Sequence, residues 1–136
     1  MIHPQLKEDC HLLGRFDSCT VLLHRNAALP WFILVPDTDL ADLLDLPLEK
    51  LHQVTEDCQR ISAFLKRNLA FDKVNFAGLG NVVPQMHLHI IGRSTKDACW
   101  PQPVWGNLST ITDYDSATIT DWREQLVSEY GLCVTE

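Results

Sequence analysis

The chain has 136 residues, of which 46% are apolar, and its formal net charge is −7. This length and composition fit one globular domain that can bury a core without disulfides or a structural metal. Acidic residues outnumber basic ones by 18 to 11, which argues against binding to polymeric nucleic acid or an anionic membrane, because both require clustered Lys and Arg. Binding of a small phosphorylated metabolite needs only a few local hydrogen-bond donors, so this possibility stays open.

The five cysteines are widely spaced and include no CxxC pair. Residues 1–9 lack the apolar core of a signal peptide, and no apolar run approaches the roughly 20 residues that span a bilayer. We therefore expect a cytoplasmic protein whose cysteines are mostly small core residues.

The first half of the chain predicts three strands and a long helix. Short apolar runs place strands at 11–16, 19–24 and 31–35, and the third is apolar throughout, which is typical of a strand buried on both faces. A short helical or irregular segment is expected at 40–46. From 47 to about 68, apolar residues recur at three- and four-residue steps, so one face of this helix should pack on the sheet.

The second half predicts a strand at 73–77, a glycine-bearing loop at 78–81, a strand at 85–92 and a helix from about 116 to just before 131. The order β-β-β-α-β-β-α indicates an α+β fold with a mainly antiparallel five-stranded sheet, one long helix packed on it and a C-terminal helix. We expect a single domain over 1–136, with its core at about 10–106 and a C-terminal helical extension at about 107–136.

Polar and apolar side chains alternate along the predicted strand 85–92, so they should fall on opposite faces. The apolar face carries Met86, Leu88 and Ile90, which can pack under the long helix. The polar face carries Gln85, His87 and His89, with successive side chains about 7 Å apart. A neutral imidazole is both a nucleophile and a hydrogen-bond donor. If a backbone carbonyl holds the Nδ1–H of His87, its Nε2 could attack phosphorus while His89 donates to a phosphate oxygen.

Two further features leave alternatives open. The loop 78–81 could bring backbone N–H groups to the same phosphate oxygens, because glycine permits close approach. However, His-x-His on a strand is also a frequent metal-ligand pair, and His24 could add a third ligand. From the residues alone, phosphate chemistry and metal binding are nearly equal.

The segment 83–91, VPQMHLHII, resembles the signature of the histidine triad (HIT) superfamily, His-φ-His-φ-His-φ-φ with φ apolar, in a branch with Gln in place of the first histidine. The flanks agree. Residues 74–78 are similar to the strand and Asn-containing turn before the signature, and 31–36 resemble the apolar strand that ends in proline early in the domain. Trp100-Pro101 also has parallels in the family. The similarity covers roughly 19–105.

The resemblance implies a homodimeric HIT-like α+β fold and a nucleotide phosphate hydrolase or nucleotidyl transferase. Its substrates would be adenosine phosphoramidates or dinucleoside polyphosphates, and the reaction would pass through a covalent nucleotidyl-histidine. The resemblance assigns the nucleophile to His87 and a phosphate contact to His89, and it places Asn75 near a polar residue of the phosphate region. It implies no metal and no other cofactor.

Three departures from the family pattern matter. Gln85 cannot titrate near neutral pH, so any proton transfer at this position is lost, which typically costs about 10²–10⁴ in rate. Val82 stands where hydrolase branches often carry a small hydroxyl residue. The strand 19–24 carries no clear acid where the family often binds ribose hydroxyls, although His24 and Asn26 lie nearby.

We therefore predict His87, His89 and Gln85 as catalytic residues, with no metal ligands. The predicted substrate-binding residues are Asn75, Gly80, Asn81, Asn26 and His24. The expected partners are a small nucleotide and a second copy of the chain, without polymeric nucleic acid or membrane. Two alternatives are kept: a nucleotide-binding protein with little turnover, and a metal-binding domain.

The three other histidines, His3, His11 and His52, are interpreted as surface or packing residues. The segment 100–105 is interpreted as a packed lid or a dimer seam.

Overall fold

The computed structural model describes residues 1–109 and 111–134, so positions 110 and 135–136 of the predicted C-terminal extension lie outside the described residues. Helix α1 (Pro4–Asp9) is followed by strands β1 (Cys10–Arg15), β2 (Cys19–His24) and β3 (Trp31–Pro36). Then come the 3-10 turn η1 (Leu43–Asp45), helix α2 (Leu48–Ala63) and the π-helical turn η2 (Phe64–Asn68). Strands β4 (Lys73–Gly78) and β5 (Leu88–Arg93) and helix α3 (Ser116–Tyr130) complete the fold.

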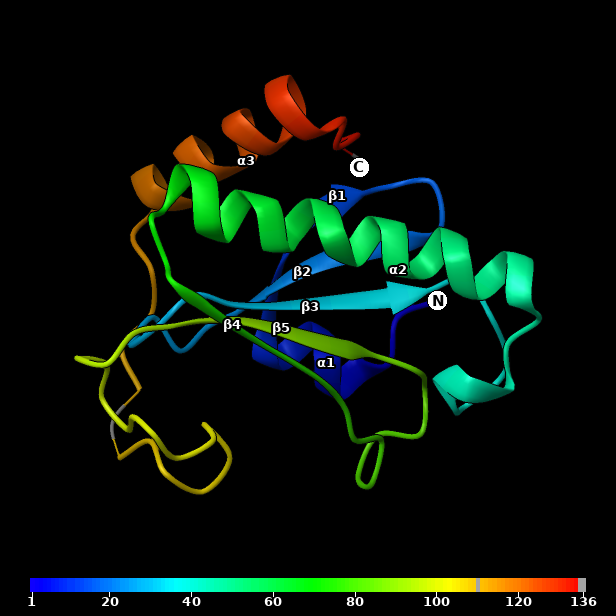
Figure 1. Ribbon diagram of the computed structural model, residues 1–136, viewed down its shortest axis with the longest axis horizontal. Helices are drawn as coiled ribbons and strands as arrows, with labels where there is room; N and C mark the ends of the chain where they lie inside the picture. The colour runs from blue at the N-terminus through cyan, green and yellow to red at the C-terminus, as the bar shows by residue number, and fades with distance from the viewer. Residues whose placement is uncertain (110, 135–136) are drawn as a thin grey trace.

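The five strands form one sheet in the order β1-β2-β3-β5-β4, and every neighbouring pair is antiparallel. Helices α2 and α3 cover one face of this sheet, whereas α1 lies on the other (Figure 1). This arrangement confirms the α+β fold with a five-stranded antiparallel sheet, a long helix and a C-terminal helix.

The long helix follows its apolar stripe. Val54, Cys58 and Ile61 are buried on one side of α2, and Pro47 precedes the helix, where its missing N–H costs nothing. The chain continues from α2 through η2 to Asn68, which is the end that the sequence predicts. The side chain of Asn68 then ties this end to α3, because its Nδ2 donates to Gln125 Oε1 at 2.9 Å.

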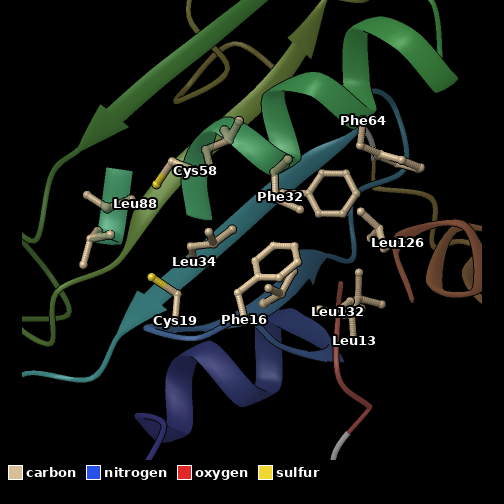
Figure 2. Packing of buried hydrophobic residues seen from close by; sticks show 14 of the residues in the cluster. Leu13, Phe16, Cys19, Phe32, Leu34, Cys58, Phe64, Leu88, Leu126 and Leu132 are labelled. Carbon is tan, nitrogen blue, oxygen red and sulfur yellow. The ribbon is translucent and has the colours of Figure 1, made fainter. Parts of the chain in front are cut away.

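The main hydrophobic core lies between the sheet and the two covering helices, as Figure 2 shows. Phe32 of β3 and Phe64 pack edge to face, with ring centroids 5.9 Å apart. Leu126 of α3 is fully buried in the same core. Burial of such side chains contributes about 1.5–3 kcal/mol each, so α3 is stabilised by packing on this core.

A second apolar cluster lies on the opposite face of the sheet. It joins Leu6 of α1 and Val104 to Trp31, Ile33 and Ile91 of the strands. Strand β3 contributes to both clusters, and all six of its residues are buried. The prediction that this strand is buried on both faces is therefore confirmed.

Two local features differ from the sequence-based prediction. Strand β5 begins at Leu88 rather than at 85. Leu88 pairs with Gly78, the last residue of β4, so β4 offers no partner to the residues that precede Leu88. The alternation of side chains nevertheless continues, and Met86 lies in the main core. Helix α1 was not predicted, since six residues are too few to show a helical period.

All five cysteines are free, and Cys10, Cys19 and Cys58 are buried. Burial raises the pKa of the Cys10 and Cys58 thiols to about 12, so these two are inert apolar packing residues. No helix within residues 1–109 and 111–134 has the length and apolar character needed to cross a membrane.

Gly14 offers a test of how the C-terminal segment is attached. Strand β1 is bulged between Leu12 and Gly14, and Cys133 exchanges two backbone hydrogen bonds with Arg15, at 2.8 and 2.9 Å. A Cβ at Gly14 would lie 2.3 Å from the carbonyl oxygen of Cys133. We expect Gly14→Ala to lower the free energy of unfolding by about 2–3 kcal/mol in urea titration.

The matched control for this change is Gly78→Ala. A Cβ there would meet only the end of the flexible Leu88 side chain, at 3.2 Å, so the expected cost is about 0.5 kcal/mol or less. Equal effects of the two variants would contradict the close backbone contact at Gly14.

Candidate active site

His87 and His89 line one cavity on the α1 side of the sheet. Their ring centroids are 5.1 Å apart, and their side chains are largely buried, with exposed fractions of 9% and 5%. The cavity has a volume of about 390 Å³. We call it the histidine cavity; its walls come from α1, the strands, the loop between β4 and β5, and Trp105. The lining residues are Gln5, Leu6, Asp9, His24, Trp31, Ile33, Leu79, Gly80, Asn81, Val82, Val83, His87, His89 and Trp105.

A hydrogen bond to the main chain fixes the tautomer of His87. Its Nδ1 lies 2.7 Å from the carbonyl oxygen of Gln85. A carbonyl oxygen can only accept, so Nδ1 carries the proton and the neutral ring keeps its lone pair on Nε2. Within the described part of the chain no group is hydrogen-bonded to this Nε2, which therefore has the state that a nucleophile requires.

His89 is held in the opposite tautomer. The indole N–H of Trp31 donates to its Nδ1 at 2.9 Å, so the proton of the neutral ring is on Nε2. Burial, followed by the proximity of His87 and His24, lowers the pKa of His89 to about 3. His89 is therefore an uncharged hydrogen-bond donor near neutral pH.

His24 reaches the cavity from the end of β2. Its ring stacks on Trp31 with centroids 4.1 Å apart and planes 9° from parallel. The backbone N–H of Asn26 donates to His24 Nδ1 at 3.0 Å, and burial lowers the pKa of His24, an effect that nearby Asp9 opposes. Asn26 itself does not line the cavity; its side-chain oxygen accepts from the N–H of Ala28 at 3.1 Å and shapes the loop after β2.

The side chain of Gln85 is engaged away from the two histidines. Its Oε1 accepts from the backbone N–H of His3 at 2.8 Å, and its Nε2 donates to the carbonyl of Met1 at 2.9 Å. The amide that stands in the first position of the triad signature therefore holds the N-terminal segment. Only the main-chain carbonyl of Gln85 acts on His87.

The other predicted binding residues divide into two groups. Gly80 and Asn81 line the histidine cavity, and Gly80 adopts a positive φ of 67°, which favours glycine in this turn. Asn75 does not line it. The side-chain oxygen of Asn75 accepts from Arg93 at 2.8 Å, and in the ladder Asn75 pairs with Ile91, two residues beyond His89.

The sequence reasoning missed several cavity residues, and three of them bear on the chemistry of the site. Trp31 lies in an apolar strand whose residues are typical of a hydrophobic core. The signal that could have identified it is its indole N–H, because a buried indole N–H usually requires an acceptor. Asp9 lies at the end of the unpredicted helix α1. Trp105 contacts His89 edge to face with centroids 4.9 Å apart, and its position follows from an irregular segment that carries no periodic signal.

The remaining histidines lie away from the cavity lining, as predicted. His3 accepts from Gln5 N–H and caps α1, His11 bonds Asp113 at 2.7 Å, and His52 is exposed on α2. Across 1–109 and 111–134, no three His, Cys, Asp or Glu side chains come together in a group that could hold a metal ion. The metal-binding alternative therefore has no ligand set within these residues.

Comparisons with known proteins agree on one family. The family model described as the HIT domain matches residues 5–96. Solved histidine triad proteins from Bradyrhizobium japonicum and Marinobacter aquaeolei are 37% and 35% identical to the chain, with TM-scores of 0.87 and 0.85. These matches cover 93% of this chain and 95% and 92% of those chains. A histidine triad protein from Sinorhizobium meliloti is 27% identical, with a TM-score of 0.87 and coverage of 93% and 94%. None of the curated proteins matches.

The low pKa of His89 predicts a pH dependence of stability. Below the ordinary value of 6.5 the unfolded chain binds a proton at this residue, whereas the folded chain does not until the pH approaches about 3. The free energy of unfolding therefore decreases as the pH falls through this range, by up to about 1.4 kcal/mol for each pH unit. Urea titrations at pH 7 and pH 5 should show this loss in the wild type and a smaller loss in His89→Gln. Equal losses would contradict the buried neutral state.

Proposed function

Because the chain belongs to the histidine triad family, we propose that it is a nucleotide phosphate hydrolase or nucleotidyl transferase with His87 as its nucleophile. The observation that carries this proposal is the hydrogen bond from His87 Nδ1 to the Gln85 carbonyl. It leaves the Nε2 lone pair available beside a second, uncharged imidazole that can only donate from its Nε2.

In the proposed reaction, His87 Nε2 attacks the phosphorus of a bound nucleotide and displaces the leaving group. A water molecule, or another acceptor, then releases the nucleotide from the covalent nucleotidyl-histidine. The Nε2–H of His89 donates to a non-bridging phosphate oxygen, where charge develops in the transition state. Gly80 and Asn81 line the same cavity, and in the proposed reaction their backbone N–H groups supply further donors.

The rest of the histidine cavity suits a nucleoside. Trp105, Leu6 and Val83 give it an apolar and aromatic wall that can cover a base. Asp9 and His24 place a hydrogen-bond acceptor and a donor in the same lining. The single phosphate that His87 attacks would be bound by neutral N–H donors, because no Lys or Arg occurs among the described lining residues.

Removal of the nucleophile provides the direct test. We expect wild-type protein to turn over a fluorogenic adenosine phosphoramidate or diadenosine tetraphosphate, with or without EDTA. His87→Ala should lower the rate by about 10³ or more. His52→Ala, which removes an exposed histidine from α2, should leave the rate unchanged. Acid quenching followed by mass spectrometry should locate a nucleotidyl group on His87.

Other outcomes would favour the two alternatives. Tight nucleotide binding without turnover would indicate a nucleotide-binding protein in which the glutamine in the first triad position has removed efficient catalysis. Turnover or folding that is lost in EDTA would indicate a metal-dependent protein. Unchanged turnover in His87→Ala would reject the proposed nucleophile.

We further infer that the functional form is a homodimer joined along β4. This strand lies at one edge of the sheet, with β5 as its neighbour on one side. Phe76 on this strand is 49% exposed, and together with Val74 it lines a groove between the strand and α2. Exposed apolar edge strands are typical sites of association.

A charge on this edge should prevent association. We expect Phe76→Asp to convert the protein from dimer to monomer in size-exclusion chromatography with light scattering, because a carboxylate would be buried without a partner in the interface. Val127→Asp, at a residue of α3 that is 42% exposed, is the matched control and should remain dimeric. A wild-type monomer, or a dimer that survives Phe76→Asp, would refute this interface.

A further inference from the structure

A second cavity meets the histidine cavity at His87. Its volume is about 540 Å³, and it lies between the segment 41–45 and the loop that begins at Gly78. The two cavities share three lining residues, Leu79, Gly80 and His87. We call the second one the aspartate cavity, because Asp42 and Asp45 line it.

The lining of the aspartate cavity is acidic and apolar. Asp42 and Asp45 are exposed carboxylates, and Leu43, Leu44 and Leu79 are among the apolar residues of the lining. No Lys or Arg accompanies them in the lining formed by the described residues. Two unit charges interact by about 1 kcal/mol at 4 Å even in bulk water, and more at a protein surface. A cation with an apolar stem is therefore attracted to this cavity, whereas a second phosphate group is repelled.

His87 links this cavity to the chemistry. It lines both cavities and is 9% exposed, and the hydrogen bond at its Nδ1 leaves Nε2 as the lone-pair nitrogen of the neutral ring. A phosphorus bound there carries a nucleoside and a leaving group. The histidine cavity, at about 390 Å³, has room for one of them, and the adjoining space past Leu79 and Gly80 is the aspartate cavity.

We propose that the aspartate cavity binds the leaving group and selects a cationic amine, so that the substrate is a nucleoside phosphoramidate of a positively charged amine and not a dinucleoside polyphosphate. This inference rests on the proposed function and chooses between the two substrate classes that the family resemblance leaves open. Asp42 and Asp45 act in it as specificity residues.

The proposed reaction balances as a hydrolysis. His87 Nε2 forms a bond to phosphorus as the P–N bond breaks, and the bonding electron pair stays on the amine nitrogen, which takes a proton from solvent water. A second water then attacks the phosphorus, and the P–His87 bond breaks with its electrons returning to Nε2. Over the two steps one water is consumed, and the products are a nucleoside monophosphate and the free amine.

Three adenosine 5′-phosphoramidates of equal chain length provide the test. Their amine portions are 4-aminobutylamine, butylamine and 4-aminobutyrate, which share a four-carbon chain and end in an ammonium, a methyl and a carboxylate group. We expect wild-type kcat/KM to be about tenfold higher for the cationic than for the anionic compound, since about 1.4 kcal/mol corresponds to a factor of ten. Diadenosine tetraphosphate should be the poorest substrate of the four.

The double variant Asp42→Asn/Asp45→Asn should reduce this preference to about threefold or less and leave the neutral butyl compound unaffected. The control Asp72→Asn/Glu124→Gln removes two exposed carboxylates that line neither cavity, and it should keep the wild-type preference. An unchanged preference in the first double variant, or a wild-type preference for the anionic compound, would overturn the inference.

Binding separates this inference from the proposed function. The same three compounds are titrated by calorimetry into His87→Asn, and into this variant with Asp42→Asn/Asp45→Asn added, so that preference is measured without turnover. Binding that favours the cation and depends on the two aspartates supports the cavity assignment even if the wild type lacks activity. Equal affinities for the three compounds reject the assignment even if the wild type is an active hydrolase.

Discussion

The hydrogen bond between His87 Nδ1 and the main-chain carbonyl of Gln85 governs the chemistry available to the site. It exists because β5 begins only at Leu88, so that this carbonyl lies outside the ladder of the sheet. A strand that began three residues earlier would commit the same backbone to a neighbouring strand. The early end of β4 at Gly78 therefore contributes to the choice of tautomer at His87.

Packing on the sheet face that α2 and α3 cover holds the backbone in the conformation that this hydrogen bond requires. Met86 and Leu88 flank His87 in the chain and are buried in the main core, which fixes the backbone on either side of the imidazole. On the near side, Trp31 orients His89 through its indole N–H. Different partners thus fix the tautomers of the two histidines: a carbonyl acceptor for His87 and an indole donor for His89. As a result, the neutral His87 ring has a lone pair on Nε2, whereas the neutral His89 ring has a proton on Nε2, and both residues line one cavity.

The sequence predicted what depends on local periodicity and failed where distant segments meet. Alternation placed His87 and His89 on one face, and the apolar stripe predicted the helical stretch that α2 and η2 form together. By contrast, the partners of Gln85 lie 82 and 84 residues away at the N-terminus, and no local pattern records such a contact. The contact of Asn75 with Arg93, which depends on the register of β4 against β5, was likewise not predicted. Asp9 was missed because a six-residue helix has no measurable period.

Electrostatics connects the site to the chain as a whole. Burial lowers the pKa of His24 and His89, so these cavity histidines bring no positive charge near neutral pH. The net charge of −7 and the carboxylates in both cavities add a negative field. A long polyphosphate would require fixed cations to offset this field. A single phosphate diester-like centre carries about one negative charge, which a few oriented N–H donors can stabilise once water is displaced. The same field that disfavours a polyanion attracts a cation, so the charge balance of the fold is consistent with the cationic leaving group that we propose.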